Sequence, residues 1–469
     1  MLFSSTTFLY LFLPCVVLLY YTVCKRSRLM QNILLLAASL FFYAWGEPKF
    51  VLVMLLSITV NWVMGLAVHG VRDKKTASRL VISLDVAFNL GILFIFKYLN
   101  FTANTVCRIL GTDSPIPSIA LPIGISFFTF QAMSYVLDVY RGKGRVQKNI
   151  LYVGLYISFF PQLIAGPIVR YETVAEEIVN RRETLNDFFD GFARFVTGLA
   201  KKVLLANGFA VLADAAFDST DTISAAFGWL GALGYTLQIF FDFSGYSDMA
   251  IGMGRMFGFH FLENFNYPYI STSVSEFWRR WHMSLGTWFR DYLYFPLGGS
   301  RVSKGRLVFN LFAVWFLTGL WHGANFTFII WGLMYFVLIT AEKLTGFDKK
   351  KGKKFGALRW AYTMFFVVIG WVLFRAESLS DAAMYLKSMF LLAGNPVSDG
   401  MFTGYLAQNA VLIIIGIFAC TPVMKNLKNQ FKPNALTEAL RVICLIALLV
   451  LSAASLVSSS YNPFIYFNF

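Results

Sequence analysis

Residues 275–301 read SEFWRRWHMSLGTWFRDYLYFPLGGSR, and residues 317–326 read LTGLWHGANF. They follow QIFFDFSGYSDMAIGMGRMFGF at residues 238–259, and long apolar segments flank the whole region. It contains three of the chain's four histidines, His260, His282 and His322. A charged side chain at a bilayer centre costs about 2.5–3.5 kcal/mol on insertion scales, so titratable residues kept among membrane segments indicate a functional site.

The composition predicts an all-α polytopic membrane protein. The 469 residues are 57% hydrophobic and 14% charged, with a mean hydropathy of +0.62, whereas soluble domains carry about 25% charged residues. The net charge of +15 resides in short loops between apolar runs, so the positive-inside rule explains it and nucleic acid is not an expected partner. No Pro/Gly/Ser-rich linker divides the chain, so we expect one domain over residues 1–469.

The apolar runs predict a bundle of about 11–12 membrane-embedded helices, at about 20 residues per span. The runs lie at residues 8–23, 33–45, 51–68, 80–96, 123–139, 150–168, 192–212, 225–241, 307–320, 327–341, 360–374, 410–420 and 442–457. We divide the bundle into N-terminal helices (1–140), a core with both motif histidines (150–345) and C-terminal helices with a tail (360–469).

Two segments depart from simple spans. The run at 150–168 contains Pro161, Gly166 and Pro167, which predict a bent or re-entrant helix. The polar and acidic segment 170–190 is expected to be a solvated surface helix.

Basic clusters predict the orientation. They follow the first, third and fifth apolar runs and recur at residues 343–354. Placing these loops in the cytoplasm puts both termini outside. The first run lacks a basic leader and a small-residue cleavage site, so it reads as a retained helix and not as a signal peptide.

Polar residues form a seam on the helix that contains Asp242. Gln238, Asp242 and Tyr246 recur every four positions and therefore share one face. The seam is either the wall of a hydrated path or a set of hydrogen bonds to a neighbouring helix, and its pattern does not separate the two.

Residues 277–292 show helical periodicity with aromatic side chains on one stripe. Arg279 and Arg290 fall on the opposite side, and His282 lies at the edge of the stripe. The pattern is typical of a helix in the membrane interface. Such a helix is either purely structural or the gate of a substrate tunnel, with His282 and the two arginines at a cytoplasmic donor entrance.

His322 lies between two apolar runs, flanked by Gly319 and Gly323, which allow other backbone to approach closely. An intramembrane histidine is a functional candidate by default, and the alternative is a buried histidine with satisfied hydrogen bonds. A zinc site shared with His282 is disfavoured, because no cysteine or acidic ligand lies at metal-binding spacing, and we predict no metal.

These motifs resemble the membrane-bound O-acyltransferase family, and most closely its bacterial branch of alginate O-acetyltransferase-like proteins. FFPQLIAGPIVRY at 159–171, FDFSGYSDMAIG at 241–252 and MLFSSTTFLYLFLP at 1–14 match the same branch, so the resemblance covers nearly the whole chain. The teichoic-acid D-alanyl transferases are related. One departure is Tyr335, where relatives often carry a histidine.

The resemblance implies a bundle with a central tunnel and interfacial or re-entrant helices. His322 would be the active-site histidine and His282 the second motif histidine. Tyr466, in FIYFNF at 464–469, would be an acyl carrier, although the aromatic tail could equally be a membrane anchor. Residues expected at the substrate or donor tunnel are Arg279, Trp281, Arg290, Asp291, Trp321, Asn325, Gln238 and Asp242.

The function that the resemblance implies is transfer of acetyl groups across a bacterial cell membrane to an extracytoplasmic polysaccharide. The acceptor would be an alginate-like polymer, cellulose, another exopolysaccharide or peptidoglycan. The donor substrate would be acetyl-CoA or another acyl thioester, with no bound cofactor, and an extracytoplasmic SGNH-type acetyltransferase would be the partner. The alternatives are D-alanyl transfer to teichoic acid, a polytopic transporter, and a scaffold that recruits a secreted partner.

Overall fold

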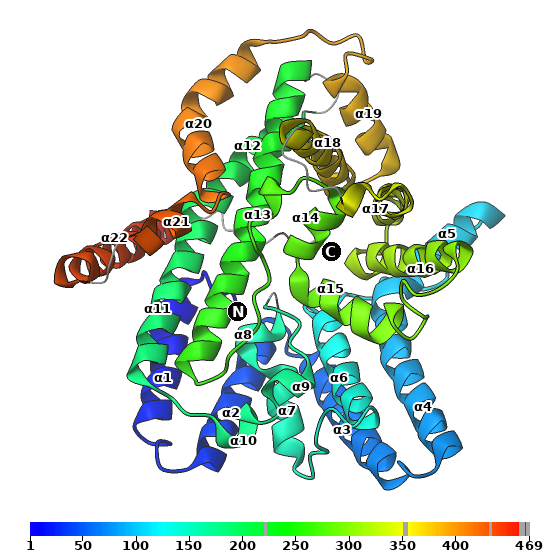
Figure 1. Ribbon diagram of the computed structural model, residues 1–469, viewed down its shortest axis with the longest axis vertical. Coiled ribbons are helices and arrows are strands. Elements are labelled where there is room, and N and C mark those ends of the chain that lie inside the picture. The colour runs from blue at the N-terminus through cyan, green and yellow to red at the C-terminus, as the bar shows by residue number, and fades with distance from the viewer. Residues whose placement is uncertain (165, 220–222, 350–354, 431–433, 459–464, 466–469) are drawn as a thin grey trace. The chain divides into compact units, whose positions relative to one another are not determined.

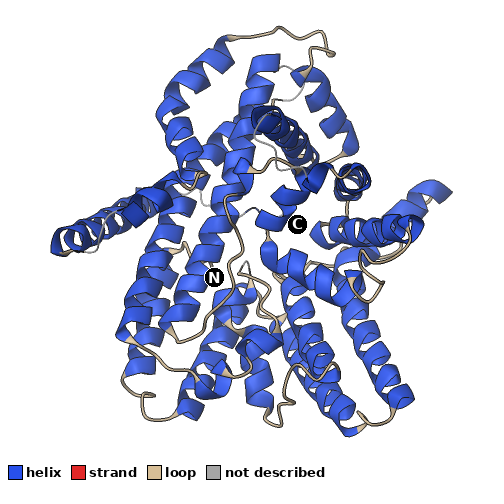
Figure 2. Cartoon of the chain, in the orientation of Figure 1, coloured by secondary structure: helices blue, strands red, loops and turns tan. Residues whose placement is uncertain are grey.

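The computed structural model describes residues 1–164, 166–219, 223–349, 355–430, 434–458 and 465. Throughout these ranges the regular elements are helices, and no strand occurs in them (Figure 2). The predicted all-α class is therefore confirmed.

The chain forms two compact units that interleave along the sequence. The first contains Met1–Val196 and Tyr246–Leu262, and the second contains Thr197–Gly245 and Glu263–Phe469. Two helices, α11 (Leu185–Ala200) and α13 (Ala225–Met256), contribute residues to both units. Our three-part division of a single domain stays a prediction.

The first unit is built mainly from α2, α3, α4, α6 and α7. Helices α3, α4 and α6 pack side by side (Figure 1), and Asn89 of α4 donates to Oδ1 of Asn61 of α3 at 3.0 Å. Besides parts of α11 and α13, the helices of this unit are α1 (Leu13–Tyr21), α2 (Arg28–Gly46), α3 (Val51–Gly70), α4 (Lys75–Leu93), α5 (Leu99–Leu110), α6 (Ile125–Tyr140), α7 (Ile150–Ser158), α8 (Phe160–Leu163), α9 (Tyr171–Val174) and α10 (Glu177–Asn180).

The predicted bend in the run 150–168 is confirmed. Helix α7 ends at Ser158, and α8 begins two residues later after a non-helical Phe159. The N–H of Phe160 donates to Oγ of Ser39 at 3.0 Å, which supplies a partner for a main-chain group that the broken helix leaves free.

The predicted surface helix at 170–190 is wrong. The segment consists of two four-residue helices, α9 and α10, a connection in which the side chain of Arg181 is fully buried, and the first residues of α11. The Arg181 guanidinium donates to Oδ1 of Asn32 at 2.7 Å, the Tyr20 hydroxyl at 3.0 Å and the Phe257 carbonyl at 3.1 Å. Burial follows because these acceptors replace water around the charge.

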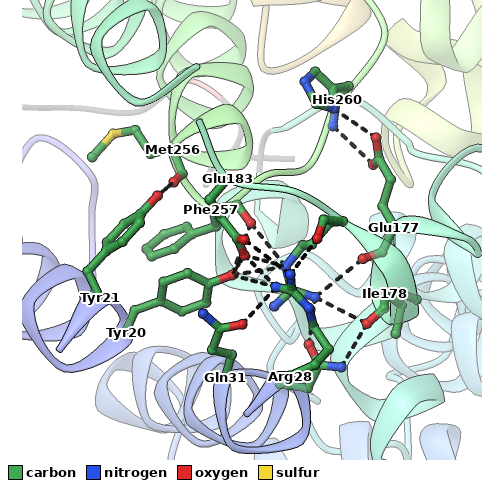
Figure 3. Close-up of polar contacts among 12 residues, drawn as sticks. Tyr20, Tyr21, Arg28, Gln31, Glu177, Ile178, Glu183, Met256, Phe257 and His260 are labelled. Carbon is green, nitrogen blue, oxygen red and sulfur yellow. Dashed lines mark hydrogen bonds and ion pairs between the residues drawn. The ribbon is translucent and has the colours of Figure 1, made fainter. Parts of the chain in front are cut away.

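Glu183 completes this network. It accepts from Nη2 of Arg28 at 3.1 Å and from the Tyr20 hydroxyl (Figure 3). Burial acts to raise the pKa of Glu183, but the hydrogen bonds from Arg28 and Tyr20 outweigh it, and the pKa is lowered. We call Tyr20, Arg28, Asn32, Arg181 and Glu183 the arginine clasp. It ties α1 and α2 to the chain that leads into α11.

The second unit has an aromatic core that includes Trp281, Trp331, Trp371 and Tyr335, all buried. A π-helical turn, η3 (Lys201–Ala206), precedes α12. Besides part of α13, the helices are α12 (Asn207–Phe217), α14 (Val274–Arg280), α15 (Met283–Phe289), α16 (Lys304–His322), α17 (Phe326–Thr345), α18 (Gly356–Arg375), α19 (Leu379–Met389), α20 (Gly400–Ala419), α21 (Val423–Gln430) and α22 (Ala435–Ser458).

Eight helical stretches among the described residues are long and apolar enough to cross a membrane. The remaining segments in our count of 11–12 are shorter or more polar, and their placement in the membrane stays a prediction. The eight are Arg28–Gly46, Val51–Gly70, Lys75–Leu110, Leu185–Phe217, Phe326–Thr345, Gly356–Arg375, Gly400–Ala419 and Ala435–Ser458.

Candidate active site

His322 is the last residue of α16, and a glycine contact with α17 sets its position. A Cβ on Gly319 would lie 2.5 Å from the Phe328 carbonyl oxygen, and one on Gly332 would lie 2.5 Å from that of Trp315. Only hydrogen fits at these two positions, so the main chains of α16 and α17 touch. His322 follows Gly319 by less than one turn, and the rigid hairpin holds its backbone.

Aromatic rings surround the His322 side chain. The residue is 4% exposed, and its ring centroid lies 5.0 Å from those of Trp321 and Trp331 and 5.2 Å from that of Phe374. Trp331 and Phe374 also contact each other, at 5.3 Å. The rings hold the imidazole in an apolar environment, where a hydrogen bond to a reacting group is stronger than in water.

The helix expected over residues 277–292 is interrupted, and this corrects our prediction. Helix α14 ends at Arg280 and α15 begins at Met283, because His282 has a left-handed φ of 43°. Asn264 supplies the reason. Its carbonyl accepts from the Met283 N–H at 2.9 Å, and its Oδ1 accepts from the Ser284 N–H at 3.2 Å. These bonds start a new helix immediately after His282.

His282 lies at this break, between two helices too short to span a membrane. It is 2% exposed, and its ring contacts Phe243 at 4.6 Å and Trp321 at 5.7 Å between centroids. Trp321 also contacts His322, so one indole lies against both histidines. Burial lowers the pKa of His282 to about 3. Burial thus favours the neutral form of the ring, and the role of His282 at a donor entrance stays a prediction.

Asp242 lies in a buried ion pair. Its Oδ1 is 2.8 Å from Nζ of Lys202, and its Oδ2 accepts from the N–H of Ile465 at 2.9 Å. Tyr246, the next residue of the predicted seam, belongs to the first unit, where its hydroxyl is 3.3 Å from Oγ of Ser4. Contacts with neighbouring segments thus account for both residues, which favours the hydrogen-bonded alternative over a hydrated path.

Comparison with known proteins identifies the family. A model of the membrane-bound O-acyltransferase family matches residues 145–379. The probable alginate O-acetylase AlgI of Pseudomonas putida is 41% identical, with all of both chains covered. The chain belongs to the membrane-bound O-acyltransferase family. It is a multi-pass membrane enzyme, and the matched region includes both motif histidines.

Two further relatives are more distant. The peptidoglycan O-acetyltransferase of Helicobacter pylori is 32% identical, over all of this chain and 98% of its own. The teichoic acid D-alanyltransferase of Bacillus subtilis is 30% identical, over 54% of this chain and 69% of its own. The similarity to the D-alanyltransferase is thus confined to about half of this O-acyltransferase.

Three predicted tunnel residues lie on the surface of the O-acyltransferase or near it. Arg279 is exposed, and no hydrogen bond or ion pair to it occurs within the described residues. Arg290 is exposed and pairs with its neighbour Asp291 at 3.0 Å. Their role at a donor entrance stays a prediction.

The other predicted positions are mostly packed. Trp281 packs against Trp371 in a tilted arrangement, with ring centroids 4.8 Å apart. Asn325 caps α17, since its Oδ1 accepts from the Thr327 N–H at 3.1 Å, and its amide donates to the Glu377 carbonyl at 2.7 Å. Gln238 is buried. Tyr466 lies outside the described residues.

Our sequence analysis missed two groups. Lys202 is a charged residue in the apolar run 192–212. The free-energy cost of keeping a charge there could have marked it as a functional candidate. Trp331 gave no such signal, because a tryptophan in an apolar run is ordinary. Its indole N–H is buried with no hydrogen-bond partner in the described part of the chain, as are the indole N–H of Trp278 and the hydroxyl of Tyr335.

Proposed function

We propose that this O-acyltransferase moves acetyl groups from an acyl thioester to an extracytoplasmic polysaccharide, with His322 as the general base. The observation that carries the proposal is the position of His322, buried at a helix end that a glycine contact fixes. The names of the full-length relatives support acetyl transfer and a polysaccharide acceptor. The polymer would be alginate-like, cellulose, another exopolysaccharide or peptidoglycan.

His322 would take the proton of the attacking hydroxyl as its oxygen bonds to the thioester carbonyl carbon. The carbon–sulfur bond then breaks, and the departing thiolate takes the proton back from the imidazolium. A neutral histidine, with an ordinary pKa of about 6.5, suits both proton transfers near neutral pH. The thioester is already activated, so this mechanism needs no metal.

Trp331 would assist at the carbonyl oxygen. Its ring contacts that of His322, and its N–H has no protein partner among the described residues. As the hydroxyl attacks, the carbonyl oxygen gains negative charge, which a fixed N–H in a dry site stabilises well. The indole of Trp331 would be such a donor, because its ring centroid lies 5.0 Å from that of the base.

The donor, acetyl-CoA or an acyl-carrier protein, would enter from the cytoplasm, and the acetyl group would leave on the outer side. Tyr466 would receive it first as an ester and pass it to an SGNH-type partner outside the membrane. A phenol suits such a relay, because its pKa of about 10 makes it a better leaving group than an alcohol. The protein would reside in a bacterial inner membrane with both termini outside.

O-acetylation is favoured over D-alanyl transfer, because relatives that match this chain along its whole length are O-acetyl-transferring proteins by name. The D-alanyltransferase match covers 54% of it. A transporter or a scaffold would retain its activity without His322.

The test is thioester consumption by the purified protein in liposomes. We expect His322→Ala to lower the rate about 10²–10⁴-fold at unchanged protein level. His69→Ala, at an exposed histidine of α3, is the matched control and should behave as wild type. Full activity of a well-folded His322→Ala protein would refute the assignment.

A further inference from the structure

In the second unit, a buried ion pair holds α13 against η3, the π-helical turn that contains Lys202. The side chains of Lys202 and Asp242 are each 2% exposed, and Nζ and Oδ1 are 2.8 Å apart. Gly245, one turn after Asp242, explains the approach. A Cβ there would lie 2.8 Å from the Gly198 carbonyl oxygen and 3.1 Å from the main-chain nitrogen of Lys202. The lysine therefore reaches the carboxylate directly.

The pair leaves one carboxylate oxygen for another donor. Oδ2 accepts from the main-chain N–H of Ile465 at 2.9 Å, and the Ile465 side chain is 7% exposed within the apolar core of the second unit. Helix α22 packs on η3, the turn that contains Lys202.

A main-chain contact of this kind fixes the position of the chain. The bond is charge-assisted and therefore stronger than one between neutral groups. It uses the N–H of residue 465 and not its side chain. Tyr466 is the next residue in the sequence.

We propose that Lys202 and Asp242 form a docking site for the main chain at Ile465, and that this site positions Tyr466 for acyl transfer. Asp242 is then a positioning residue and not a wall of the tunnel. Lys202 holds the carboxylate in position through the 2.8 Å contact. The positioning role rests on the proposed function of Tyr466, whereas the docking does not.

The experiment removes the donor at Ile465 and leaves Lys202 and Asp242 unchanged. Proline has no N–H, so Ile465→Pro abolishes the bond, and Ile465→Val is the matched control that keeps it. Each variant carries a cysteine in place of Asn468, with the five native cysteines replaced by alanine. Maleimide labelling rates report access to the tail, and polymer acetyl content in cells reports transfer.

We expect Ile465→Pro to label at least tenfold faster and to lower polymer acetylation at least tenfold, with Ile465→Val unchanged. Asp242→Asn should shift both readouts in the same direction. Slow labelling in both Ile465→Pro and Asp242→Asn would overturn the docking. Fast labelling with full acetylation would overturn the positioning role.

Tyr466→Phe separates this inference from the proposed function. It should keep slow labelling and lose acetylation. If Tyr466→Phe acetylates at the wild-type level, the relay is wrong and positioning falls with it, while the labelling rates still decide the docking. If Tyr466→Phe is inactive and Ile465→Pro is fully active, the relay stands and Asp242 does not position it.

Discussion

Gly332 of α17 packs against Gly319 of α16 so closely that a methyl group on Gly332 would lie 3.2 Å from the Gly319 Cα. The same methyl group would lie 2.5 Å from the Trp315 carbonyl oxygen. Backbone does not yield as a side chain does, so Gly332→Ala must move the two helices apart and shift His322. Overpacking of this kind costs about 1–3 kcal/mol.

Gly332→Ala should therefore lower both the unfolding temperature in detergent and the acetyl-transfer rate, the latter about 10-fold or more. Gly305→Ala is the matched control, because nothing lies within 4 Å of the added methyl group. Wild-type activity of Gly332→Ala would show that the hairpin contact does not position the base.

Trp331→Phe removes one N–H from the ring beside His322 and keeps an aromatic side chain. If the indole stabilises the oxyanion, kcat should fall about 10²-fold with little change in donor KM. Trp371→Phe is the control, since Trp371 is also a buried tryptophan but its ring is not among those in contact with His322. Equal losses in the two variants would point to packing instead of catalysis.

Glu183→Gln tests the arginine clasp. The amide keeps the shape but loses the charge that pairs with Arg28, so the unfolding temperature should fall by about 5 °C. Asn180→Gln is a suitable control, because Asn180 is exposed and its side chain bonds only to Glu176 among the residues that the structure describes.

The clasp also predicts a pH dependence. The folded-state pKa of Glu183 is lowered, so its contribution to stability is full above the ordinary carboxyl pKa and is lost as the pH falls through the folded value. Thermal unfolding between pH 7 and pH 3 should show a smaller acid destabilisation in Glu183→Gln than in the wild type. Identical pH profiles would contradict this.

Arg279→Ala tests the donor entrance. The arginine is exposed on α14 and can meet phosphate groups of the donor. If it does, the donor KM should rise several-fold while kcat changes little. Equal losses of membrane retention and rate would favour a role as a headgroup anchor.

Cysteine labelling tests the orientation. Single cysteines at Lys75 and Lys349 should react with an impermeant reagent only after cells are opened, because the positive-inside rule places both in the cytoplasm. A cysteine at Ser114, in the loop between α5 and α6, should react in intact cells. Labelling of Lys349→Cys from outside would reverse the orientation.

Hydropathy and spacing were enough to predict the helical class. A membrane span must hydrogen-bond its own backbone groups, so it forms a helix and appears in the sequence as a long apolar run. The prominence of His322 was also visible, since a histidine between two such runs and two glycines is costly to keep. Both signals are local in the sequence.

The break at His282 was not visible, because its cause is tertiary. The periodicity from Phe277 to Tyr292 continues through the break, and the groups that start the second helix come from Asn264. The burial of Arg181 was missed for a similar reason. Its acceptors belong to α1, to α2 and to Phe257, the residue after α13. The charged composition of the segment alone is typical of a solvated helix.

The separation of Arg28 and Glu183 along the chain has a consequence for biogenesis. The two residues are 155 positions apart. At about 5–20 residues per second, the carboxylate is synthesised roughly 8–30 s after the guanidinium. During that interval Arg28 lacks its partner Glu183. Helices α1 and α2 are therefore synthesised before the contact that locks them exists, and the clasp closes late in the maturation of this unit.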